Sequence, residues 1–134
     1  MLTARTMAIT ISKVDGIWTV TRPPAFPAKL FPGDEVTWKL LPDPDNPNKR
    51  ISAHLQFCHD NFVLGVGLSR DWTASIGPVG GGIPEAYLTL TIHDAAEKSR
   101  KHHYAVWVCD QDLRPTFGTF ALGVNPPPEL DLGP

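Results

Sequence analysis

The stretch AITISKVDGIWTVTR, residues 8–22, carries the clearest structural signal in the chain. Two runs rich in β-branched residues, each alternating between apolar and polar positions, flank the pair Asp15-Gly16. Aspartate followed by glycine suits the positive φ angles of a two-residue hairpin turn. The pattern therefore predicts a β-hairpin with strands over residues 8–14 and 17–22.

The same two-residue alternation recurs beyond the hairpin. It predicts further strands over residues 34–41, 51–57, 86–93 and 116–124. The stretch HHYAVWVCDQ, residues 102–111, is apolar on both faces, which is typical of a strand at the centre of a sheet. The 14 prolines and 11 glycines separate short apolar runs, and no segment of useful length has helical periodicity. Strands that each have one apolar face can bury these faces when two sheets pack face to face.

The composition narrows the classes of partner. Lysine and arginine total 12 against 14 acidic residues, for a net charge of −2, and no basic stripe is present. We therefore expect no nucleic-acid partner. No apolar run approaches the roughly 18 residues that span a membrane, and the N-terminus lacks the apolar core of a signal peptide. With only two cysteines, a reducing compartment is favoured, and we expect a cytoplasmic protein that does not contact the membrane.

Two segments carry a family resemblance. FPGDEVTWKL, residues 31–40, is similar to the PGDxVxW strand entry of the cupredoxin-like sandwich. HYAVWVC, residues 103–109, resembles the late strand of that fold, which carries an aromatic residue two positions before a copper-binding cysteine. Those positions are Trp107 and Cys109 here. The resemblance implies a cupredoxin-like fold, with His54 and Cys109 at the positions of two copper ligands.

The copper site itself is not expected. The family places a histidine, and usually a methionine, just beyond the cysteine, whereas neither residue follows Cys109 in this chain. His102 and His103 lie six or seven residues upstream on the same predicted strand, roughly 20 Å away at the rise of a β-strand. A trigonal copper site needs its second imidazole close to the cysteine. The resemblance thus implies a fold without redox activity.

The ending GTFALGVNPP, residues 118–127, together with the short strand-rich form, resembles a small bacterial group, the DP-EP family, which has no established function to transfer. The predicted fold is all-β: a single-domain antiparallel β-sandwich of seven to nine strands, cupredoxin-like or immunoglobulin-like. We expect the sandwich over residues 1–124 and a proline-rich C-terminal tail over residues 125–134.

The segment HLQFCH offers further candidate metal ligands, His54, Cys58 and His59. On a strand, His54 and Cys58 share a face but lie about 13 Å apart, too far for one coordination shell. Cys109 or a histidine from another strand is needed to complete a site. We expect no metal site and no cofactor, and keep these four residues as the candidates to examine.

Catalytic signatures are absent from the sequence. There is no G-x-S-x-G motif, and the glycine run 80–82 lacks the lysine and hydroxyl residue of a phosphate loop. The segment DPDNPN, residues 43–48, has Asn48 where a calcium loop needs glycine and is explained by turn formation. We favour a non-enzymatic protein, although catalytic groups that converge from distant segments are not visible in a sequence.

The expected function is a small non-catalytic binding or assembly module that uses a sheet face or an edge strand. Its expected partners are a second copy of the chain, through an edge strand, or a peptide or protein. The alternative is a metal-binding protein, for zinc or Cu(I), that uses Cys58, Cys109 and nearby histidines.

Overall fold

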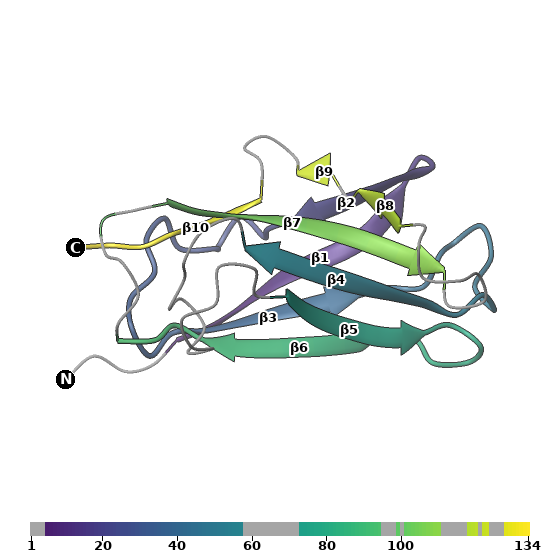
Figure 1. Ribbon diagram of the computed structural model, residues 1–134, viewed down its shortest axis with the longest axis horizontal. Helices are drawn as coiled ribbons and strands as arrows, with labels where there is room; N and C mark the ends of the chain where they lie inside the picture. The colour runs from purple at the N-terminus through teal and green to yellow at the C-terminus, as the bar shows by residue number, and fades with distance from the viewer. Residues whose placement is uncertain are drawn as a thin grey trace.

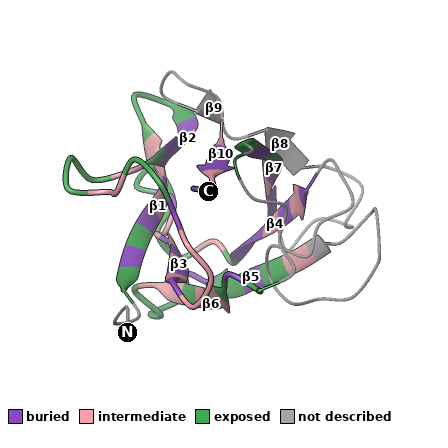
Figure 2. Ribbon diagram, turned by 90° about the vertical axis from the view of Figure 1, so that its left-hand side faces the viewer, coloured by how far each residue is buried: buried purple, intermediate pink, exposed green. Residues whose placement is uncertain are grey.

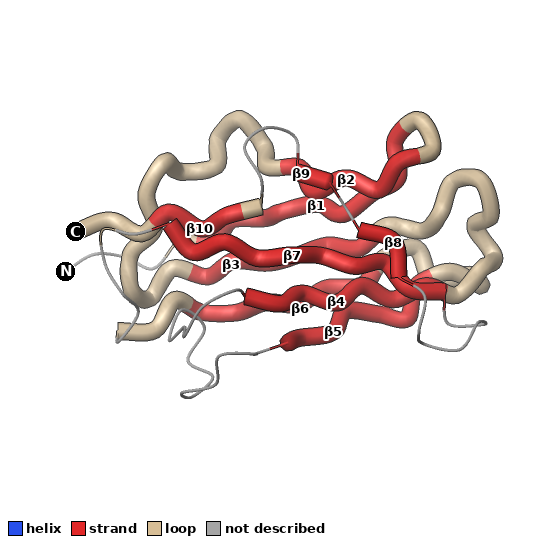
Figure 3. Tube along the Cα trace, turned by 45° about the horizontal axis from the view of Figure 1, so that its top comes forward, coloured by secondary structure: helices blue, strands red, loops and turns tan. Residues whose placement is uncertain are grey.

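The computed structural model describes residues 5–57, 73–94, 99, 101–110, 118–120, 122–123 and 128–134. All regular structure in these ranges is β-strand (Figures 1 and 3). The strands are β1 (Thr6–Val14), β2 (Ile17–Thr21), β3 (Glu35–Leu40), β4 (Ile51–Phe57), β5 (Thr73–Val79), β6 (Ala86–Thr91), β7 (Lys101–Asp110), β8 (Gly118–Phe120), β9 (Leu122–Gly123) and β10 (Glu129–Asp131). No helix in the described ranges is long and apolar enough to cross a membrane.

The strands form two sheets that pack face to face, as the sequence predicts. The first has the order β6-β3-β1-β2-β9, and the second has the order β10-β7-β4-β5. Strand β8 pairs with the second half of β7, beyond the part that pairs with β10. Figure 2 shows the two sheets from the end, with buried and exposed positions alternating along β1.

Two strand pairs depart from the predicted antiparallel arrangement. Strand β1 pairs with β3 in parallel, and β2 pairs with β9 in parallel. The hairpin places β2 on one side of β1, and the proline-rich crossover over residues 22–34 then returns the chain to the start of β1. Strand β3 therefore runs beside β1 in the same direction, which only a long connection permits. The described ranges contain ten strands, of which β8, β9 and β10 are very short.

The hairpin and the inward faces follow the sequence closely. Asp15 and Gly16 have φ angles of 52° and 79°, as the predicted turn requires. The apolar positions predicted to face inward on β3 and β4 are buried: Val36, Trp38, Leu40, Ile51, Ala53, Leu55 and Phe57. Between the sheets, the Trp38 indole N–H donates to the Tyr104 hydroxyl at 3.2 Å. Burial raises the pKa of Tyr104, so this hydroxyl stays neutral.

The C-terminal segment contributes to the sandwich. Where the proline run predicts a tail, Glu129–Asp131 forms β10 against the start of β7. Leu130 and Leu132 are fully buried in the core. The Leu30 N–H donates to the Asp131 carbonyl at 2.8 Å, which joins β10 to the crossover. Two alternating leucines after three prolines were too short a pattern to predict a strand.

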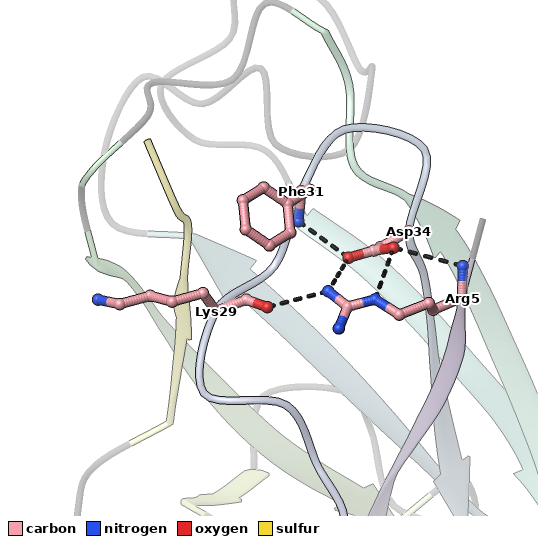
Figure 4. A network of polar contacts seen from close by, with 4 residues as sticks. All are labelled: Arg5, Lys29, Phe31 and Asp34. Atoms are coloured by element: carbon pink, nitrogen blue, oxygen red, sulfur yellow. Dashed lines mark hydrogen bonds and ion pairs between the residues drawn. The ribbon is translucent and has the colours of Figure 1, made fainter. Parts of the chain in front are cut away.

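One polar network holds the crossover against the first strand (Figure 4). The Arg5 guanidinium contacts the buried Asp34 carboxylate, with Nη2 and Oδ2 2.7 Å apart. The same carboxylate accepts from the Phe31 N–H at 2.9 Å, and Arg5 also donates to the Lys29 carbonyl at 3.0 Å. Burial opposes ionisation of Asp34, but these donors and the positive charge outweigh it and hold its pKa below the usual value.

We expect the Asp34→Asn variant to lose about 1–3 kcal/mol of unfolding free energy, because the Arg5 and Phe31 donors lose their charged acceptor. Because the folded pKa is lowered, the contribution of Asp34 is present above the unfolded-chain pKa of about 4 and is lost as pH falls through the folded value. Urea unfolding at neutral and acidic pH measures both effects. Lys29→Ala is the control, because its exposed ion pair with Asp131 contributes below about 1 kcal/mol. Equal losses of unfolding free energy in the two variants would contradict the stabilising role of Asp34.

Candidate functional site

His54 lies on the outer face of the second sheet, in contact with two serines. Its Nδ1 is 2.8 Å from the Ser75 hydroxyl oxygen on β5, and its Nε2 is 3.3 Å from the Ser52 hydroxyl oxygen. Both ring nitrogens are therefore engaged by neutral hydroxyl groups. This arrangement holds the imidazole between two neutral hydroxyl groups, one from β4 and one from β5.

Cys109 lies on the same outer face, one row away. The register of β4 and β7 sets Cys109 opposite Ser52 and Trp107 opposite His54. Cys109 is a free, buried thiol, and burial raises its pKa. A thiolate is the form that attacks substrates and binds metals, so this environment disfavours both uses.

The structure thus brings together two of the four candidate metal ligands, His54 and Cys109, on one sheet face. Within the described ranges, no group of three or more histidine, cysteine, aspartate or glutamate residues is arranged to hold a metal ion. The predictions for Cys58 and His59 concern residues outside those ranges.

The edge of the first sheet offers a different kind of site. Strand β6 pairs with β3 along its whole length, and no other described strand pairs with its opposite side. Just beyond it, the Ile92 N–H donates to the Asp34 carbonyl at 2.8 Å. Backbone groups along an antiparallel strand point alternately to one side and the other. Counting back from Ile92, the amides of Leu90 and Leu88 point toward β3.

The amide and carbonyl groups of Tyr87, Thr89 and Thr91 consequently point away from β3. A contact between two threonine side chains agrees with this direction of the backbone groups. Thr89 lies opposite Thr37 on β3, and their hydroxyl oxygens are 2.8 Å apart, as suits the closely spaced, non-hydrogen-bonded type of pair. The outer side of β6 is therefore a row of three donors and three acceptors with which no other described strand pairs.

The side chains of β6 do little to block such pairing. The strand reads AYLTLT, with no charge and no proline. On its inner face Leu88 and Leu90 are only half-buried, although they pack against the core, and on its outer face Tyr87 is 54% exposed. Natural edge strands are usually protected by charges, prolines, bulges or short length.

The other described edges have such protection. Strand β5, the edge of the second sheet that lies beside β6 in Figure 2, carries Pro78 and a register irregularity in its pairing with β4. Strands β9 and β10 have only two and three residues. Within the described ranges, β6 is the one edge of full strand length without a protective feature.

Charged and titratable residues flank β6 at both ends. Glu85 precedes the strand, accepts a hydrogen bond from the Tyr87 hydroxyl and pairs with Lys39 at 2.9 Å. These two contacts lower the pKa of Glu85 and fix its carboxylate near the end of the strand. His93 follows the strand with an exposed side chain.

Comparison with family models, curated proteins and solved structures finds no match. The function proposed below therefore rests on the geometry of this chain alone. The sequence predicts a strand over residues 86–93 with its leucines inward, but not its place at the edge of a sheet. No local signal marks that place, because the charge or proline that usually protects an edge strand is missing from this one.

Proposed function

We propose that this protein is a small non-catalytic binding and assembly module that takes up an extended strand along the outer edge of β6. The observation that carries the proposal is the row of outward amide and carbonyl groups at Tyr87, Thr89 and Thr91. Addition of a strand to a sheet edge derives affinity from main-chain hydrogen bonds, and alternate side chains provide specificity.

The state of the reactive groups supports a non-catalytic role. Burial disfavours the thiolate of Cys109, which is the reactive form of this side chain. The pKa shift at Cys109 thus runs opposite to that of an activated nucleophile.

We further infer a cupredoxin-like variant of the sandwich. The segment that resembles the cupredoxin strand entry forms the end of the crossover and β3, with Trp38 fully buried. The segment that resembles the copper-binding strand forms β7, which ends near Cys109. A free thiol in this position also supports a reducing, cytoplasmic location.

The metal-binding alternative is supported by the shared face of His54 and Cys109. Elemental analysis of protein purified without a histidine tag separates the two functions. Since only these two candidate ligands lie together in the described ranges, we expect no stoichiometric zinc or copper. Stoichiometric metal that disappears in the Cys109→Ser variant would favour the alternative.

The strand-pairing function is tested by selecting short random peptides on the wild-type protein. Proline at position 89 removes an amide that points away from β3, so Thr89→Pro keeps the β3–β6 hydrogen bonds and blocks only the outer edge. Thr89→Ala is the matched control, because it retains the amide. We expect selected peptides to be rich in β-branched residues and to bind Thr89→Pro about tenfold more weakly than wild type or Thr89→Ala.

Circular dichroism verifies that each variant is folded. Selection that retains no peptide on the wild-type protein, when the edge of β6 takes up no other strand either, would contradict the proposal. Peptides that bind Thr89→Pro as tightly as wild type would contradict it equally, since they would not use the edge of β6.

A further inference from the structure

We propose that the strand that pairs with β6 is β6 of a second copy of the chain, in an antiparallel homodimer whose two-fold axis passes through Thr89. This inference rests on the proposed strand-pairing function and names its partner. It would join the first sheets of two copies into one continuous sheet across the dimer.

The hydrogen-bonding pattern selects the position of the axis. With the axis at Thr89, Thr89 faces Thr89 of the second copy and Tyr87 faces Thr91, so all the outward amide and carbonyl groups are paired within the two strands. With the axis at Leu88, Thr91 faces Glu85, which lies outside the strand. With the axis at Leu90, Tyr87 faces His93, which also lies outside. Only the axis at Thr89 uses the full edge.

The same axis also sets compatible side chains of the two copies opposite each other on both faces of the sheet. On the inner face, Leu88 of each copy comes opposite Leu90 of the other, in the closely spaced type of pair. These half-buried leucines would cover each other and extend the two cores toward the axis. On the outer face, Tyr87 comes opposite Thr91, an aromatic and β-branched pair of the kind that stabilises sheets.

Charge complementarity supports a second copy as the occupant. Strand β6 is uncharged, so self-pairing sets no like charges opposite each other. In the register centred on Thr89, Glu85 faces His93 of the second copy, and the two-fold axis repeats this contact at the other end. The carboxylate of Glu85 is already positioned by Lys39 and Tyr87. An acid therefore meets an imidazole at both ends of the pair.

Disulfide trapping tests the register directly. In hydrogen-bonded antiparallel pairs the facing Cα atoms lie about 5.5 Å apart, within the range of a disulfide. We expect Thr89→Cys to form a covalent dimer on mild oxidation. Thr91→Cys alone should not, because the two copies of residue 91 lie four positions, or about 13 Å, apart along the strands. A mixture of Thr91→Cys and Tyr87→Cys should form a covalent dimer again.

Wild-type protein oxidised in the same way is the control for the native cysteines. Sedimentation equilibrium should show concentration-dependent dimers for wild type and Thr89→Ala, and monomers for Thr89→Pro. Cross-linking by Thr91→Cys but not by Thr89→Cys would overturn the proposed axis. A wild-type chain that remains monomeric at every soluble concentration, with no cross-link through residue 89, would overturn the homodimer.

The two proposals fail separately. If the wild-type chain is monomeric but selected peptides still bind it and lose affinity for Thr89→Pro, the strand-pairing function stands and only the second copy is excluded as partner. If neither peptides nor a second copy bind the edge, both proposals fail together.

Discussion

The ion pair between Arg5 and Asp34 is the interaction on which the arrangement of the first sheet depends. It fixes the end of the proline-rich crossover beside the start of β1, at an Nη2 to Oδ2 distance of 2.7 Å, so that β3 enters the sheet parallel to β1. Because β3 then lies outside β1, its antiparallel partner β6 becomes the outermost strand. Asp34 also accepts the Ile92 N–H through its carbonyl, which sets the direction in which every amide of β6 points.

The core explains why the inward positions of β6 are apolar. Trp38 and Tyr104 hold the sheets together through a buried hydrogen bond and an edge-to-face contact, with ring centroids 5.7 Å apart. Leu88 and Leu90 pack at the margin of that core and keep β6 in register with β3. Charged residues at these inward positions would disrupt the packing, so protection of the edge would have to come from the outward positions. Those positions hold tyrosine and threonine.

Alternation of apolar and polar residues is a local property of the sequence, so it predicts the strands, the turn between two of them and their inward faces. The hairpin at Asp15-Gly16, the strand over residues 51–57 and the inward face of β3 are confirmed. Pairing between distant segments leaves no comparable trace. The parallel pairing of β1 with β3 depends on where the crossover docks, and the position of β10 depends on the bridge between Leu30 and Leu132. The same holds for the candidate site. The shared face of His54 and Cys109, and the side of β6 that pairs with no described strand, both follow from the pairing between distant strands.

Amide hydrogen exchange along β6, measured at low and high protein concentration, tests the central claim most directly. In dilute protein, the amides of Leu88 and Leu90 should be protected by β3, while those of Tyr87, Thr89 and Thr91 should exchange freely. At high concentration, we expect protection to appear at these three outward amides and to be absent in Thr89→Pro. Outward amides that exchange at the same fast rate at both concentrations, or that are already protected in the dilute monomer, would contradict the account.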